Sequence, residues 1–237
     1  MGLLALAIAP GLAICLFIYY KDKYNKEPLW MLLMAFVLGA LSILPAIVVQ
    51  LGYGADIQAI RQGGTLSVAF FSYCVVGGSE EISKFLMLRL FIFSRKHFDD
   101  PFDGIVYAVM VGMGFATIEN IGYVYEHGLG TGIMRMFLSV PAHGTFAVLM
   151  GYFTGFAKFR PGARLGYFLL AILMPVLFHG TFDFFIFLDS DGLLALGAIV
   201  SFILALYLSF RAIRNKQMLS KLYYDQKNGI ILPQENL

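Results

Sequence analysis

Ionisable residues lie inside four stretches of this sequence that are otherwise apolar. A charged side chain at bilayer depth is costly, so residues of this kind usually face a wet cavity and mark a functional site. The four groups are Glu80 and Glu81 with Lys84, Glu119 with Asn120, His143 alone, and His179 with Asp183. Two adjacent carboxylates, a third carboxylate and two imidazoles are suited to activating a water molecule for hydrolysis.

The densest group is Glu80-Glu81-Ile82-Ser83-Lys84. In a helix, Glu80 and Lys84 share a face and can pair, whereas Glu81 points about 100° away and can face a cavity. Two carboxylates for one lysine leave surplus buried negative charge, which favours uptake of a proton by one carboxylate. The alternative interpretation is a buried ion pair that fixes helix packing.

Glu119 and His143 each allow a catalytic and a structural interpretation. Glu119 follows Gly112 and Gly114, which would let a neighbouring helix approach closely. His143 follows Pro141, which would free backbone groups and could kink its helix. Both side chains could complete a catalytic site, or they could serve interhelical hydrogen bonding alone.

His179 and Asp183 are four residues apart and therefore share one helix face. A carboxylate at this spacing can orient an imidazole and set its tautomer. The pair could instead stabilise the helix alone. Pro175 lies four residues before His179 and could open the helix near the site.

The elements that must position these residues are membrane helices. Hydrophobic residues make up 59% of the chain and charged residues 14%, far from the composition of a soluble domain. Seven apolar runs are each long enough to cross about 30 Å of hydrocarbon: 2–20, 29–51, 66–93, 104–125, 136–157, 165–187 and 193–210. Open strands in lipid would leave backbone groups unpaired. We therefore predict an all-α, polytopic membrane protein with about seven transmembrane helices.

Lysine and arginine gather in alternate loops, at 21–28, 94–103 and 158–164 and in the tail after 210. The positive-inside rule assigns these segments to the cytoplasm, with the N-terminus outside and the C-terminus cytoplasmic. We predict one transmembrane domain over 1–214 and a short cytoplasmic tail over 215–237. The expected partners are the lipid bilayer and a membrane protein, and no nucleic acid.

The predicted topology places the polar groups at similar depth. At about 1.5 Å per residue, Glu119, His143 and His179 lie about 9–12 Å from the outer ends of their helices. Glu80 lies about 15–21 Å into its own helix. Four helices thus deliver polar groups to one layer in the outer half of the membrane. A shared cavity that opens to the outside is the expected arrangement.

These motifs, taken in order, resemble those of the PrsW family of bacterial intramembrane proteases. The resemblance covers most of the chain except the C-terminal tail. It rests on residues 80–84, 115–120, 141–143 and 179–183, and extends to 20–28 and 102–107. The family looks distantly similar to the CAAX prenyl proteases, which share a paired-glutamate helix and later histidine motifs.

The resemblance implies a multi-pass peptidase of the bacterial cell membrane. Such an enzyme makes the first, outer-side cut (site-1) in a single-pass, membrane-bound anti-sigma factor. That cut leads to release of a sigma factor in response to envelope stress or antimicrobial peptides.

We expect Glu80 or Glu81 to activate the attacking water, near Glu119 and with Lys84, Asn120 and Asp183 in support. His143 or His179 would stabilise the oxyanion or bind a divalent metal such as zinc. Three protein ligands plus water is the usual catalytic zinc arrangement, and His143, His179 and Glu81 could supply it. The sequence contains no His-Glu-x-x-His motif, and a metal-free glutamate mechanism would use the same residues.

Two other classes of protein remain compatible with buried ionisable residues. A proton-coupled or small-molecule transporter also needs them, but its polar groups should connect both faces of the membrane. The inner halves of the same helices look dry, at 106–111 and 168–173. A non-catalytic membrane receptor is the third class, and it would keep its function without any protease activity.

Overall fold

The computed structural model describes residues 2–54, 56–188 and 195–230. The described chain is helical and contains no strand, which confirms the predicted all-α class. The α-helices are α1 (Gly2–Lys21), α2 (Leu29–Leu41), α3 (Ile43–Tyr53), α4 (Ile57–Gln62), α5 (Thr65–Phe70), α6 (Ser79–Met87), α7 (Asp103–Phe137), α8 (Ser139–Phe159), α9 (Arg164–Leu188) and α10 (Ala195–Lys227). Two π-helical stretches, η1 (Phe71–Gly78) and η2 (Leu88–Ile92), and a short 3₁₀ turn, η3 (Pro161–Ala163), complete the order.

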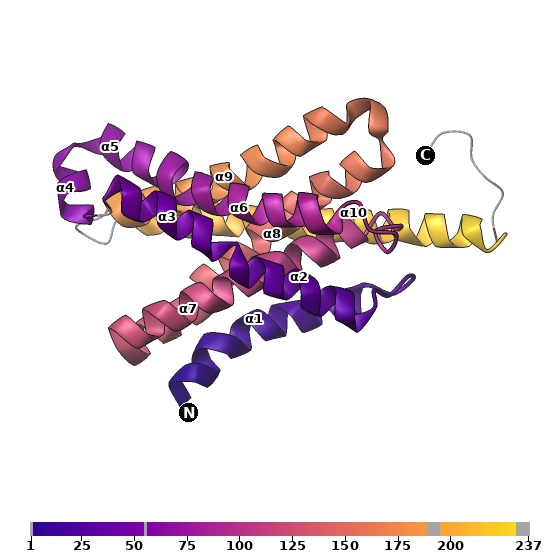
Figure 1. The fold of residues 1–237 in the computed structure, drawn as a ribbon, viewed down its shortest axis with the longest axis horizontal. Helices are drawn as coiled ribbons and strands as arrows, with labels where there is room; N and C mark the ends of the chain where they lie inside the picture. Colours follow the sequence, from indigo (N-terminus) through magenta and orange to yellow (C-terminus); the bar gives the residue numbers. More distant parts are fainter. Residues whose placement is uncertain (1, 55, 189–194, 231–237) are drawn as a thin grey trace.

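Most helices run along the long axis of the molecule (Figure 1). The loops after α1 and η2 gather at the end towards which α10 extends, and α4 and α5 lie at the opposite end (Figure 1). By length and composition, five segments could cross a membrane: Gly2–Lys21, Leu29–Tyr53, Asp103–Phe159, Pro161–Leu188 and Leu196–Lys227. The third is 57 residues long and contains both α7 and α8. The number of crossings and the orientation of the termini stay predictions.

The segment from α5 to η2 is one continuous helical rod that carries Glu80, Glu81 and Lys84 on α6. Its π-helical turns precede and follow α6, so the glycines Gly77 and Gly78 continue the helix rather than break it. Gly77 lies against the backbone of α9, where an added Cβ would come 3.2 Å from Gly180 N. This close contact brings the acidic turn of α6 next to α9.

The long run predicted at 29–51 is divided into α2 and α3 at Ser42. Pro45 lacks the amide hydrogen that would bond to the fourth residue before it, and this explains the interruption. The Ser42 hydroxyl donates to Gly39 O at 2.6 Å, which satisfies one carbonyl at the end of α2.

Helix α7 forms the centre of the bundle and packs against α1, α2 and α8. Every residue from Asp103 to Thr117 is buried, as expected of a helix surrounded by protein on all sides. Small residues allow the closest contacts: Gly114 faces the carbonyl of Phe36 on α2, and Gly104 faces Gly151 on α8. These contacts replace side-chain packing by direct backbone contact, as is common between membrane helices.

Residues 215–227, predicted as part of the tail, continue α10 as a helix. Lys216 and Ser220 are buried there, and the Gln217 side chain donates to Lys21 O at 2.6 Å. The first half of the predicted tail is therefore docked on the bundle. Residues 231–237 lie outside the described part of the chain.

We expect Gly114→Ala to lower the free energy of unfolding by about 1–3 kcal/mol, because the added methyl would overlap backbone that cannot move aside. Gly122→Ala is the matched control, since nothing lies within 4 Å of its added Cβ. Denaturation in detergent would compare the two variants. Equal stability of both would contradict the close packing of α2 on α7.

Candidate active site

The predicted acidic turn of α6 is folded around the Lys84 ammonium. Lys84 Nζ lies 2.8 Å from Glu81 Oε1 and 3.3 Å from Glu80 Oε2. It also lies over the ring of Phe115, at 3.9 Å from the centroid. All three ionisable side chains are buried. The lysine is therefore shared between the two carboxylates and pairs with both of them.

Helix α9 brings His179 against the same carboxylates. His179 Nδ1 lies 2.9 Å from Glu81 Oε1, and Nε2 lies 3.3 Å from Asp183 Oδ2. The imidazole stacks on the Phe146 ring, with centroids 5.0 Å apart and planes 18° apart. Asp183 thus occupies the orienting position that its spacing from His179 predicts.

Helix α8 supplies His143, which links Lys84 to Glu119 on α7. His143 Nδ1 lies 3.3 Å from Lys84 Nζ, and Nε2 lies 2.9 Å from Glu119 Oε2. The two imidazole rings meet edge to face at 4.9 Å between centroids. The polar groups of four helices therefore form one network, whereas their common depth in the membrane and a cavity that opens to the outside stay predictions.

Two members of the network were not predicted. Arg135 Nη2 pairs with Glu119 Oε2 at 2.7 Å, and Gln50 Nε2 donates to Glu80 Oε1 at 3.2 Å. Arg135 reaches Glu119 because α7 is interrupted at Gly128, where φ is +78°, and the chain turns back. A lone arginine flanked by apolar residues after a glycine-rich turn was the signal available in the sequence. Gln50 is neutral, so no charge marked it.

Asn120 lies at the edge of the network and joins helices. Its amide donates to Ala7 O on α1 at 3.0 Å, and its oxygen accepts from Arg135 Nε at 3.0 Å. Asn120 thereby holds the arginine that pairs with Glu119. These contacts can position the arginine, and the supporting role predicted for Asn120 stays a prediction.

The exposed fractions of the side chains show where the network reaches the molecular surface. Glu80, Glu81, His143 and His179 are 1–4% exposed, whereas the side chains of Glu119 and Asp183 are 17% and 14% exposed. The last two lie at opposite ends of the network. The innermost carboxylates are therefore closed off from the surroundings, and the network reaches the molecular surface at Glu119 and Asp183.

The donor set fits a divalent metal. One ligand atom each from Glu80, Glu81, His143 and His179 can be chosen so that all lie within 4.8 Å of one another. Glu81 Oε2 is buried without a hydrogen-bond partner, which leaves a lone pair available for an ion. The network also holds four carboxylates and two permanent cations, Lys84 and Arg135, a surplus of two negative charges. Lys84 contacts three of the four donors, so its ammonium competes with a metal for them.

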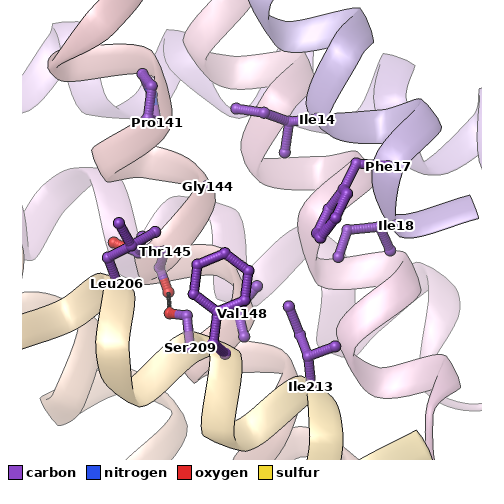
Figure 2. Close-up of a pocket in the computed structure, with 11 residues that line it drawn as sticks. Ile14, Phe17, Ile18, Pro141, Gly144, Thr145, Val148, Leu206, Ser209 and Ile213 are labelled. Atoms are coloured by element: carbon purple, nitrogen blue, oxygen red, sulfur yellow. Dashed lines mark hydrogen bonds between the residues drawn. The ribbon is translucent and has the colours of Figure 1, made fainter. Parts of the chain in front are cut away.

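A separate hollow lies on another face of α8. It is an apolar groove of about 230 Å³ between α1, α8 and α10, shown in Figure 2. Pro141 and Gly144 line it, while the neighbouring His143 belongs to the buried network. A hydrogen bond from Ser209 to Thr145 O, at 3.1 Å, crosses its floor. The groove offers apolar surface and no titratable group.

A polytopic helical bundle with a buried glutamate and histidine site defines the class as a membrane-embedded, metal-type hydrolase. The model of a family described as PrsW family intramembrane metalloprotease matches residues 27–210. The chain belongs to this family, and it is therefore a multi-pass membrane protease that acts on a membrane-embedded protein substrate.

Curated relatives agree over most of the chain. Protease PrsW of Bacillus subtilis (strain 168) is 36% identical over 184 residues, which cover 77% of this chain and 82% of the relative. Protease PrsW of Oceanobacillus iheyensis is 34% identical over 217 residues, covering 91% and 98%. Protease PrsW of Clostridioides difficile (strain 630) is 36% identical over 196 residues, covering 80% and 81%. No solved structure gives a significant match.

We expect Lys84→Met to destabilise the protein by about 3–5 kcal/mol, because it leaves two buried carboxylates without their cation. Adding Glu80→Gln should restore part of the loss by removing one of the negative charges. Unfolding in detergent measures both effects, and Lys221→Met on the exposed face of α10 is the control. A double variant no more stable than Lys84→Met would contradict this charge balance.

Proposed function

We propose that this chain makes the outer-side cut in a single-pass anti-sigma factor of the bacterial cell membrane, so that a sigma factor is released under envelope or antimicrobial-peptide stress. The observation that carries the proposal is the single network formed by Glu80, Glu81, His143 and His179 within a family of intramembrane metalloproteases. The bacterial origin of the relatives and the motif resemblance support the substrate and the location.

In the proposed mechanism, Glu80 is the general base. It accepts a proton from water as the water oxygen attacks the scissile carbonyl carbon, and it then returns a proton to the departing amine nitrogen. Gln50 holds one oxygen of Glu80 at 3.2 Å and so fixes the direction of the carboxylate. The Lys84 ammonium, 3.3 Å from Glu80, adds positive charge to the site, which favours the negative charge that develops on the scissile carbonyl oxygen.

Glu81, His143 and His179 are the proposed ligands of a divalent metal. When bound, such an ion supplies Lewis-acid polarisation of the scissile carbonyl. Glu119 and Asp183 contact Nε2 of His143 and of His179, and carboxylates in this position commonly orient histidine ligands. Arg135 in turn holds Glu119. The outer residues of the network thereby keep the two imidazoles directed towards Glu81 and Lys84.

We expect Glu80→Gln and Glu81→Gln each to lower the rate of cleavage by about 10²-fold or more, since a positioned base or ligand is lost. The assay reconstitutes the chain in liposomes with a single-pass anti-sigma factor, and mass spectrometry locates the cut. Glu126→Gln, an exposed carboxylate on α7, should keep full activity. Full activity of both site variants would refute the catalytic assignment, and a cut on the cytoplasmic side would refute the outer-side assignment.

Metal content provides a separate test. We expect the purified chain to carry about one divalent transition metal per molecule, and His143→Ala or His179→Ala to lose most of it. Elemental analysis measures the content. A chelator should abolish cleavage, and added zinc should restore it. Retention of the metal by both histidine variants, or cleavage that persists in the metal-free protein, would favour the glutamate mechanism without a metal.

A further inference from the structure

A second buried acidic cluster lies far from the active site, at the end of the bundle where α1 ends and α7 begins. Asp22 and Glu27 belong to the loop between α1 and α2, Asp100 precedes α7, and Asp103 is its first residue. These four side chains are 1%, 4%, 1% and 0% exposed, in that order. The proposed proteolytic mechanism uses none of them.

Hydrogen bonds satisfy the cluster incompletely. Asp103 Oδ2 accepts from the backbone amides of Asp99 and Asp100 at 2.8 and 2.7 Å. Asp103 Oδ1 and Asp22 Oδ1 are buried and have no hydrogen-bond partner. A buried carboxylate oxygen without a partner is costly. The fold therefore retains two buried carboxylate oxygens without a hydrogen-bond partner in the same region.

No lysine, arginine or histidine among the described residues forms an ion pair with these four carboxylates. The nearby ammonium groups of Lys26, Lys158 and Lys216 instead contact aromatic rings, and Lys158 also donates to a backbone carbonyl. None of these ammonium groups therefore forms an ion pair with the four carboxylates.

Carboxylate oxygens of Glu27, Asp99 and Asp103 converge within 4.8 Å of one another. The donor set contains oxygen alone, which suits hard cations such as magnesium or calcium and disfavours zinc, for which imidazole and thiolate are common ligands. Asp99 is the exposed member, with 47% of its side chain accessible, and it gives an ion a path from solvent. Glu27 also accepts a hydrogen bond from the buried Tyr107 hydroxyl, which holds its carboxylate in place.

We propose that Glu27, Asp99 and Asp103 form a binding site for a hard divalent cation, separate from the catalytic group. The ion neutralises the buried carboxylates and joins the loop after α1 to the start of α7. Two further contacts extend this connection to α10, because Ser220 donates to Asp100 Oδ2 at 2.8 Å and Lys227 lies 3.8 Å from Asp99 Oδ2. The site is structural: it fixes the end of the bundle opposite the turn that carries Arg135.

Binding can be measured on the full chain in nanodiscs after treatment with a chelator. Manganese serves as the paramagnetic probe, and magnesium and calcium serve as competitors. We expect one manganese ion to be displaced by magnesium, and its affinity to fall at least about tenfold in Asp99→Asn, which loses a charged ligand at a half-exposed position. Asp56→Asn, at the exposed start of α4, should bind like the parent. Magnesium at about 100 times its dissociation constant should raise the unfolding temperature by about 5–10 °C.

Asp103→Asn tests the buried ligand. If this variant does not fold, the manganese affinity of Asp99→Asn still tests the proposal. His179→Ala should retain the ion. Loss of the ion in His179→Ala but not in Asp99→Asn would place it in the catalytic group and overturn the proposal. Absence of binding by all three cations at about 10 mM, roughly ten times a weak dissociation constant, would also overturn it and leave protons as the neutralising charge.

Discussion

The Lys84 ammonium is the interaction on which the active-site network depends. It is buried among Glu80, Glu81 and His143, at 2.8–3.3 Å from each. Removing charges from water is expensive, and the cost is recovered only when the geometry is good and further hydrogen bonds satisfy the remaining groups. Here α6 supplies both carboxylates and their cation from a single turn, so the neighbouring helices need to contribute one imidazole each. His179 then contacts Glu81, and His143 contacts Lys84 and Glu119.

Close helix packing makes those contacts possible. Gly77 and Gly180 let the rod that contains α6 approach α9. Gly112 lets α7 approach α8, because a Cβ added to Gly112 would come 2.6 Å from the Cβ of Ala147. Larger residues at these positions would separate the helices and lengthen every polar contact of the network. In a membrane, where water does not drive helix association, such small residues permit the short distances. The glycines are thus as necessary to the site as the residues that carry charge.

The apolar runs and the eight candidate site residues could be picked out from the sequence, because a polar or ionisable group within an apolar run stands out by chemistry alone. The catalytic and supporting roles of these residues stay predictions. Arg135 escaped identification because its position depends on a reversal of the chain at Gly128, and composition does not give the direction of a turn. Asp99, Asp100 and Asp103 lie at the start of α7, where Asp103 Oδ2 accepts from the backbone amides of Asp99 and Asp100. Their proximity to Glu27 and Ser220 arises from tertiary packing, which local spacing does not reveal.

The two polar clusters lie at opposite ends of the buried part of α7. Asp103 and Glu119 are sixteen residues apart, which corresponds to about 24 Å along a helix. Between them, positions 104–116 of α7 are glycine and apolar residues apart from Tyr107, whose hydroxyl donates to Glu27, and all of them are buried. A transporter needs polar groups that connect both faces, and beyond Tyr107, which belongs to the Glu27 cluster, this stretch of α7 provides none. A dry centre with a closed polar site on one side suits hydrolysis instead, because water then reaches the peptide bond from one face and ions do not leak across the membrane.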